Sequence, residues 1–187
     1  MTRHGDWFLT YSGIQFFPMD PRPEEVQLID IAHALSRICR YGGHCLDWYS
    51  VAQHSVMVSH LVPTAFALEG LLHDAEEAYT GDMIRPIKHG LRERTDAFDV
   101  MADTLKTTIR IALGLPEIMT ADADAAVHAA DNHALSTERR DLVRDTGREW
   151  RVSREFPPIA QKIEPMERDA AKAVFFTRFL ELTRKST

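Results

Sequence analysis

Residues 71–82 read LLHDAEEAYTGD, a stretch in which leucine and alanine recur at helical spacing among ionisable side chains. This periodicity predicts a packed helix over about residues 64–79, so its ionisable groups cannot all face bulk water. Burial of such groups costs free energy unless water, an opposite charge or a metal ion compensates them. The sequence therefore raises the question of what compensates His73, Asp74, Glu76, Glu77 and Asp82.

The remaining sequence predicts an all-α domain that begins with a short β-hairpin. Residues 6–23 contain two short apolar segments on either side of Ser12-Gly13, which is typical of a hairpin. Residues 80–90 and 147–165 contain proline and glycine and are expected to be irregular. Asp30 is positioned to cap the first helix. We expect one helical bundle over residues 1–187, with helices over about residues 30–39, 50–61, 64–79, 93–113, 120–142 and 167–183.

The amino-acid composition argues against several classes of protein. The chain has 187 residues, 44% hydrophobic and 27% charged, as expected of one globular domain. It contains no apolar run of the roughly 20 residues that span a bilayer, and its first residues lack the apolar stretch of a signal peptide. Cys39 and Cys45 lack the spacing of a disulfide framework or a cysteine zinc site. A net charge of −6 argues against duplex nucleic acid and anionic membranes as partners. We expect a cytoplasmic protein.

Two further candidate metal ligands come from other predicted helices. His54 lies in YSVAQHSV and Asp131 in AVHAADNHAL, both among small and apolar residues. Alone, His54 fits a hydrogen-bonded core histidine, and Asp131 fits a helix cap or an ion-pair partner. With His73 and Asp74 they form a mixed nitrogen and oxygen donor set, which helical bundles use to bind divalent ions. The sequence thus predicts one divalent transition metal ion, of Co, Mn, Zn, Ni or Fe, with Mg as a further option.

The order His54, His73-Asp74, Asp131 resembles the H…HD…D signature of the HD-domain metal-dependent phosphohydrolases. The segment HDAEEAYTGDMIRPIK, residues 73–88, is similar to the one in bacterial 5′-deoxynucleotidases of this superfamily. There, HD is followed by Glu, by Thr-Gly-Asp and by Pro…Lys. The resemblance covers about residues 30–142 and implies that the helical bundle is an HD domain.

The resemblance also implies roles for residues near the metal ligands. Glu77 would orient or deprotonate the attacking water, Asp82 would be a second essential carboxylate, and Lys88 would lie near the phosphate. In the same enzymes an Arg-Trp pair before the first histidine contacts phosphate and sugar or base. Here the pair is Arg40-Tyr41, with Tyr in place of Trp and a spacing that needs a one-residue gap. Cations available for the phosphoryl oxygens are Arg40, Arg85, Lys88 and His89.

The expected function is hydrolysis of the 5′-phosphate of deoxyribonucleoside monophosphates by metal-activated water. Three alternatives share the machinery: dNTP triphosphohydrolases that release tripolyphosphate, alarmone hydrolases of longer multidomain chains, and cyclic-dinucleotide phosphodiesterases with a second metal. A catalytically silent, nucleotide-binding HD domain is the alternative of another class. The expected partner is a small nucleotide, and a homodimer is expected because relatives are often dimers.

Other residues are assigned secondary roles. Glu76 is expected to face solvent, and Glu138 to pair with an arginine. Trp7, Trp48 and Trp150 are expected to pack in the core or at its rim, although Trp48 is near enough to His54 in sequence to line a base pocket. Residues 175–176, two consecutive phenylalanines, indicate a C-terminal helix with a broader apolar face than one core needs. Hydrogen bonding to neighbours, rather than metal binding, is expected of His128 and His133.

Overall fold

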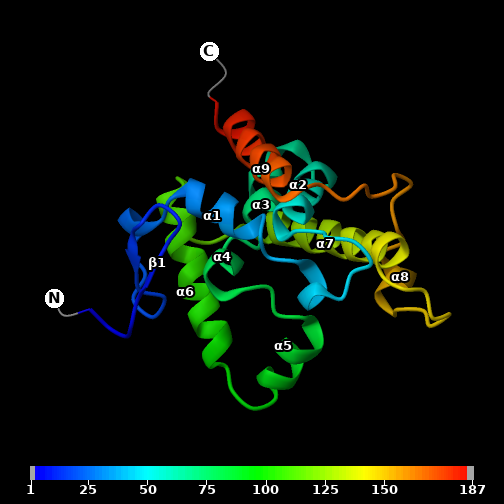
Figure 1. Cartoon of the computed structure of the whole chain (residues 1–187), viewed down its shortest axis with the longest axis horizontal. Coiled ribbons are helices and arrows are strands. Elements are labelled where there is room, and N and C mark those ends of the chain that lie inside the picture. The colour runs from blue at the N-terminus through cyan, green and yellow to red at the C-terminus, as the bar shows by residue number, and fades with distance from the viewer. Residues whose placement is uncertain (1–2, 185–187) are drawn as a thin grey trace.

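The computed structural model describes residues 3–184 and shows a bundle of helices with a small β-hairpin at one side (Figure 1). The all-α class and the hairpin are therefore confirmed. No helix within residues 3–184 is long and apolar enough to cross a membrane. The elements are β1 (Phe8–Leu9), β2 (Gln15–Phe16), α1 (Leu28–Leu35), α2 (Val51–Leu61), α3 (Ala67–Leu72), α4 (Glu77–Thr80), α5 (Arg85–Arg92), α6 (Ala97–Ala112), α7 (Ala121–Leu142), α8 (Val152–Glu155) and α9 (Arg168–Thr183), with short 3-10 helices η1 (Pro23–Glu25), η2 (Arg40–Gly43) and η3 (Thr64–Phe66).

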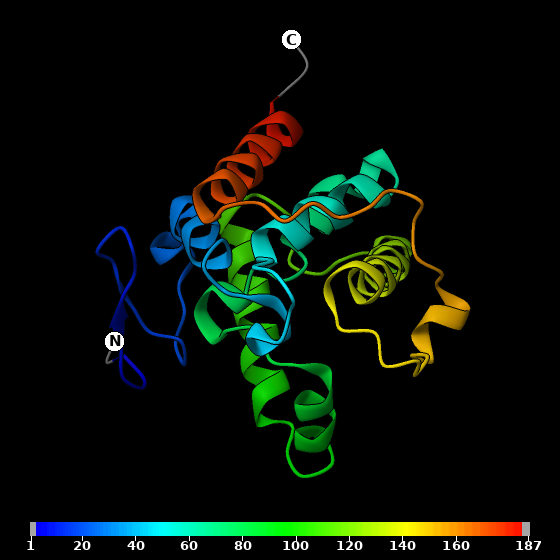
Figure 2. The same cartoon turned by 45° about the vertical axis from the view of Figure 1, so that its right-hand side comes forward.

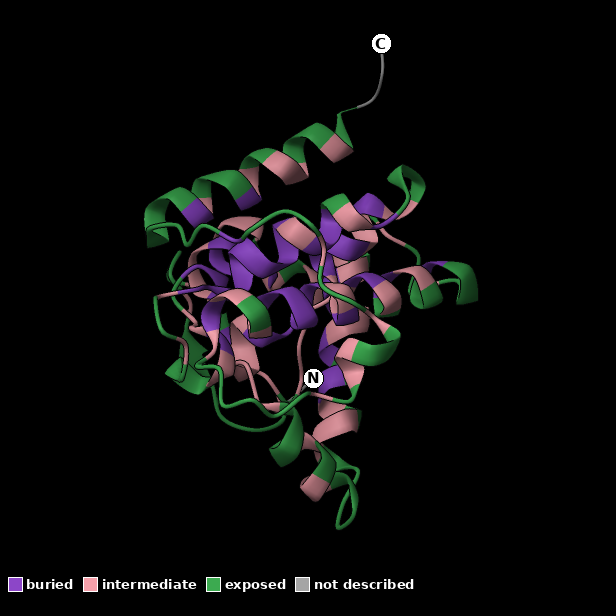
Figure 3. Ribbon diagram, turned by 90° about the vertical axis from the view of Figure 1, so that its right-hand side faces the viewer, coloured by how far each residue is buried: buried purple, intermediate pink, exposed green. Residues whose placement is uncertain are grey.

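Helix α2 is the centre of the bundle, because α3, α7 and α9 all pack against it. Figure 2 shows α9 lying above α2, with α5 and the lower end of α6 projecting away from them. The largest buried side chains come from several helices, and Figure 3 shows the buried residues gathered in the interior. The main core includes Ile31 and Leu35 of α1, Val51 of α2, Leu71 of α3 and Phe175 of α9.

A glycine permits the close approach of α3 to α2. A Cβ atom added at Gly70 would lie 3.1 Å from Val62 Cγ2 and 3.2 Å from the Ser59 Cα atom. If position 70 carried a larger residue, Val62 or the Ser59 backbone would have to shift by a few tenths of an ångström. The absence of a side chain at position 70 therefore sets the spacing of the two helices that lead to His54 and His73.

The helix predicted over residues 64–79 is interrupted. The chain forms η3, then α3, then a turn over residues 73–76, and resumes as the single turn of α4. Short-range backbone bonds tighten this turn, with Ala75 N donating to Leu72 O and Glu77 N donating to Asp74 O, both at 3.1 Å. The interruption directs two consecutive side chains, those of His73 and Asp74, toward α2.

The sequence predicts that Asp30 caps the first helix, but in the structure it does not. Helix α1 begins at Leu28, so Asp30 lies in its first turn and is buried. Its carboxylate accepts hydrogen bonds from Ser12 N at 2.7 Å and from Ser12 Oγ at 2.8 Å. The acid therefore ties the β-hairpin to α1, because the hairpin turn offers it two donors. Ser50, by contrast, caps α2 through a bond from Gln53 N, at the boundary that the sequence predicted.

Two segments predicted as irregular contain helices. Residues 85–92 form α5, with Pro86 in its first turn, where proline costs no hydrogen bond. Residues 152–155 form the short helix α8. The helix predicted from residue 93 instead begins at Ala97, because the chain turns between α5 and α6. In these two segments proline and glycine therefore lie near the ends of helices, and the segments are not continuous loops.

Both phenylalanines of α9 contact the core of their own chain. Phe175 is fully buried, and Phe176 is half-buried against the same cluster. The broad apolar face is thus explained within one chain and gives no support to a dimer.

We expect Phe175→Ala to lower the free energy of unfolding by about 3–5 kcal/mol, because it leaves a cavity between α9 and the core. Val174→Ala is the matched control, since Val174 precedes it on the same helix and is 37% exposed. Urea unfolding followed by circular dichroism measures both. Equal losses in the two variants would contradict the docking of α9 described above.

Candidate metal centre

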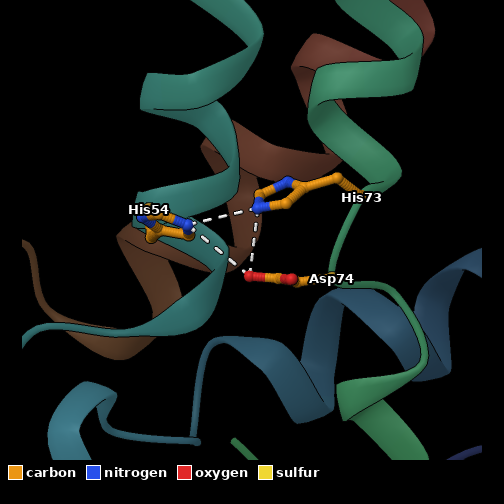
Figure 4. A group of neighbouring side chains, drawn as sticks. All are labelled: His54, His73 and Asp74. Carbon is orange, nitrogen blue, oxygen red and sulfur yellow. Dashed lines mark hydrogen bonds and ion pairs between the residues drawn. The ribbon is translucent and has the colours of Figure 1, made fainter. Parts of the chain in front are cut away.

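Three predicted ligands form a compact cluster. His54 comes from α2, and His73 and Asp74 come from the turn after α3 (Figure 4). His54 Nε2 lies 3.3 Å from His73 Nε2 and 3.5 Å from Asp74 Oδ2, and His73 Nε2 lies 3.1 Å from the same oxygen. One ligand atom from each residue thus lies within 4.8 Å of the other two.

The hydrogen bonds of the two histidines assign their tautomers. His54 Nδ1 lies 2.6 Å from the Glu138 carboxylate, and His73 Nδ1 lies 2.8 Å from the Gly70 carbonyl oxygen. Both acceptors require the proton on Nδ1, which leaves a lone pair on each Nε2. Two such lone pairs and the Asp74 carboxylate then point at one place. This donor set needs a cation and could hold a metal ion.

The charges around His54 also favour a cation at the cluster. Burial and the Arg40 guanidinium lower the pKa of His54, but the carboxylates of Glu138, Asp131 and Asp74 raise it more, to well above its usual value. In the absence of a metal, a proton therefore supplies the positive charge that the cluster requires. Metal ion and proton compete for the same nitrogen.

Asp131 lies next to His54, and it also forms an ion pair with Arg85. Its Oδ1 lies 3.3 Å from His54 Nε2, while its Oδ2 forms an ion pair of 2.7 Å with Arg85 Nη2. Arg85 is held in turn by Asn132, whose side-chain oxygen accepts from Arg85 Nη1 at 2.9 Å. The structure therefore brings the fourth predicted ligand next to His54, outside the compact group of three.

A cavity of about 710 Å³ opens beside this cluster. Helix α5 forms part of its wall, and so do Trp150 and Arg151 before α8 and Val152 at the start of α8. The predicted catalytic and substrate-binding residues all line it, together with two predicted ligands: Arg40, Tyr41, Asp74, Glu77, Asp82, Arg85, Lys88 and Asp131.

Glu77 is a buried acid on the cavity wall. Its Oε1 accepts an ion-pair hydrogen bond of 3.1 Å from Lys88 Nζ, and its Oε2 has no partner among the described residues. Burial raises the pKa of Glu77 well above its usual value, and Asp74 and Asp82 raise it further, against the effects of Lys88 and Arg40. The unpartnered oxygen of this carboxylate is buried, so Glu77 retains acceptor capacity that no described residue uses.

Arg40 balances the acids on the other side of the cavity. Its Nη2 lies 3.2 Å from Glu138 Oε2, and its Nη1 lies 3.7 Å from Asp82 and 3.9 Å from Asp74. Tyr41 also donates to Glu138 Oε2, at 2.7 Å. The prediction that Glu138 pairs with an arginine is therefore confirmed. Its contact with His54 was missed, although Glu138 follows Asp131 by seven residues and so lies on the same face of α7.

The prediction for Glu76 is wrong, and Trp48 does not line the cavity. Glu76 is buried, with 4% of its surface exposed, and pairs with Lys106 Nζ of α6 at 3.1 Å. A lysine thirty residues away supplies the compensating charge, and no local pattern reveals it. Trp48 stacks under the Arg168 guanidinium at 4.2 Å, while Trp150 lines the cavity instead.

The two histidines beside Asp131 make hydrogen bonds, as predicted. His128 Nε2 lies 3.1 Å from Asn132 Nδ2, and His133 Nδ1 donates to the Pro157 carbonyl at 2.7 Å.

Comparison with known proteins places this chain in a family. It is 38% identical over 175 residues to the protein described as uncharacterized protein YfdR of Escherichia coli strain K12, a match that covers 93% of this chain and 94% of that protein. The chain belongs to the YfdR family. Uncharacterized protein RCAP_rcc00048 of Rhodobacter capsulatus is 33% identical over 145 residues, which is 73% of this chain and 72% of that protein. No family model matches the chain.

We expect added Mn²⁺, Co²⁺ or Zn²⁺ to raise the Tm of this YfdR-family protein. At a free concentration of about 100 times Kd, one bound ion adds about 2.7 kcal/mol, or roughly 5–10 °C for a chain of this size. His73→Ala removes one donor and should abolish the shift. His60→Ala is the control, because His60 is exposed in the last turn of the helix that carries His54. An equal shift in both variants would show that the ions bind elsewhere.

Proposed function

We propose that this protein is a metal-dependent phosphohydrolase of the HD type that removes the 5′-phosphate from deoxyribonucleoside monophosphates. The observation that carries the proposal is the His-His-Asp cluster at the edge of a cavity with a buried acid and several cations. Each of these parts meets one need of phosphate-ester hydrolysis: activation of water, acceptance of a proton and neutralisation of phosphoryl charge.

His54, His73 and Asp74 would hold the metal ion, with Asp131 as the fourth ligand. The three compact donors fit a divalent ion because both imidazoles present lone pairs and the carboxylate supplies negative charge. Such a mixed donor set accepts Co, Mn, Zn, Ni or Fe, and Mg as a further option. When bound, a divalent ion supplies Lewis-acid activation of water and of a phosphoryl oxygen.

Glu77 would orient the attacking water and accept its proton. Glu77 lines the cavity and its Oε2 has no partner among the described residues, so this oxygen would accept from the water, and the raised pKa of this acid strengthens it as a base. Lys88 holds the other oxygen at 3.1 Å and so fixes the direction of the carboxylate. Asp82, which lies 3.7 Å from Arg40, would keep that guanidinium in place beside the phosphate.

Arg40, Arg85 and Lys88 would bind the phosphoryl oxygens. All three line the cavity, and each is paired with a carboxylate of the site. A phosphate dianion offers several acceptor oxygens at once and can share these cations with the acids. The two that come from α5, Arg85 and Lys88, lie one turn apart on that helix and so present adjacent charges.

The nucleoside would occupy the part of the cavity away from the metal. Its volume of about 710 Å³ lies within the usual range of small-molecule sites. Tyr41 and Trp150 line the cavity with ring centroids 6.1 Å apart, and Leu135, Val143 and Val152 line it as well. Aromatic and aliphatic walls of this kind favour a planar base.

Hydrolysis of a panel of dNMPs, NMPs and dNTPs with Co²⁺, Mn²⁺, Mg²⁺ or Zn²⁺ tests the proposal, with products separated by chromatography. Nucleoside plus inorganic phosphate from a dNMP is the expected result. Tripolyphosphate from a dNTP would assign the protein to the triphosphohydrolases. If folded, metal-loaded protein binds nucleotides without turnover, the hydrolase proposal fails and a silent binding domain remains.

We expect Glu77→Gln to lower kcat by about 10²–10⁴-fold, because the amide cannot accept the proton. Metal affinity should change little, since Glu77 is outside the compact ligand cluster. Glu93→Gln, at an exposed position just after α5, is the control for loss of one acid. Full activity in Glu77→Gln would contradict its role as the base.

A further inference from the structure

Glu138 is a fully buried acid that the proposed chemistry does not use. It lies on α7 with none of its surface exposed, and its two oxygens have different partners. Oε1 lies 2.6 Å from His54 Nδ1, whereas Oε2 lies 2.7 Å from the Tyr41 hydroxyl and 3.2 Å from Arg40 Nη2. One carboxylate thus joins a candidate metal ligand to two residues of the cavity wall.

The bond to His54 determines which nitrogen faces the cluster. A carboxylate can only accept, so it holds the proton on Nδ1 and leaves the Nε2 lone pair for a cation. The same bond fixes the plane of the ring, because His54 is fully buried and Glu138 is held from the other side. Carboxylates placed behind a metal-binding histidine act on metal affinity in this way.

The bonds to Tyr41 and Arg40 hold a strained turn. Tyr41 has a φ of 58°, in the left-handed region that a tyrosine seldom adopts. Gly42 follows with a φ of 60°, so the chain turns sharply within η2. The Tyr41 hydroxyl bond at 2.7 Å offsets part of this strain and fixes the side of the cavity on which the ring lies.

We propose that Glu138 is a positioning residue that couples the metal-binding histidine His54 to the substrate-binding turn of Arg40 and Tyr41. Loss of its charge then affects two sites at once. The substrate half of this inference rests on the proposed phosphohydrolase function, whereas the metal half rests only on the His-His-Asp cluster. Neither half requires Glu138 to touch substrate.

Glu138→Gln separates these effects from simple loss of volume. Glutamine has the same shape but offers one acceptor oxygen and one donor nitrogen, so it cannot accept at both ends. We expect Kd for Mn²⁺ to rise about 10–100-fold. We also expect KM to rise in the same variant, because the Arg40–Tyr41 turn loses its anchor.

Two further variants act as controls. Tyr41→Phe removes only the hydroxyl bond, so KM should rise while Kd for Mn²⁺ stays within about two-fold of the wild type. Asp141→Asn removes a buried acid on the same helix, whose carboxylate binds Arg140 and the Ile163 backbone, and should change neither constant. The inference is overturned if Glu138→Gln leaves Kd for Mn²⁺ at the level of Asp141→Asn, with secondary structure intact by circular dichroism.

If the Glu138→Gln variant does not fold, a measurement on the wild-type protein still tests the inference. Nitrogen-15 NMR of the histidine side chains, with Zn²⁺ bound, should show His54 protonated at Nδ1 and a strongly downfield Nδ1 proton. A proton on Nε2 instead would overturn the inference. Both the NMR signal and the Kd for metal are independent of turnover, so failure to hydrolyse any nucleotide would contradict the proposed function without deciding the role of Glu138.

Discussion

Two imidazole nitrogens that both carry lone pairs cannot remain 3.3 Å apart, beside a carboxylate, unless positive charge lies between them. The surrounding residues maintain this condition. Glu138 and the Gly70 carbonyl keep the Nδ1 protons on the outer side of each ring, and the turn after α3 places His73 and Asp74 in succession. The interior of the bundle thus surrounds a position that favours positive charge, and in the absence of a metal the raised pKa of His54 places a proton there.

Acidic and basic side chains of the cavity wall form ion pairs with one another. The acids Glu77 and Asp131 face Lys88 and Arg85, both contributed by α5. Helix α5 has no buried residue, so these ion pairs and the loops at its ends hold it against the bundle. The cations are therefore supplied by the element least fixed by apolar packing, while the acids and histidines come from the core or its immediate neighbours. The cations of the cavity thus depend on ion pairs for their placement, whereas the candidate ligands depend on the packing of the core.

The sequence predicted the clustering of His54, His73 and Asp74 better than the chain path around them. His54, His73 and Asp74 were predictable because each lies among apolar residues at helical spacing, and the structure brings them together. The turn at residues 73–76 was not, since a continuous helix satisfies the same periodicity. Glu76 was assigned to solvent because its partner Lys106 lies on another helix. Glu138 carried a local signal in its distance from Asp131, but its contact with His54 depends on how α7 crosses α2.

The close contact of α2 and α3 at Gly70 bears on the geometry of the candidate cluster. The Val62 side chain and the Ser59 backbone lie against α3 at this point. A methyl group at position 70 would require these neighbours to shift by a few tenths of an ångström. The arrangement of the candidate ligands thus depends in part on the absence of a side chain three residues before His73.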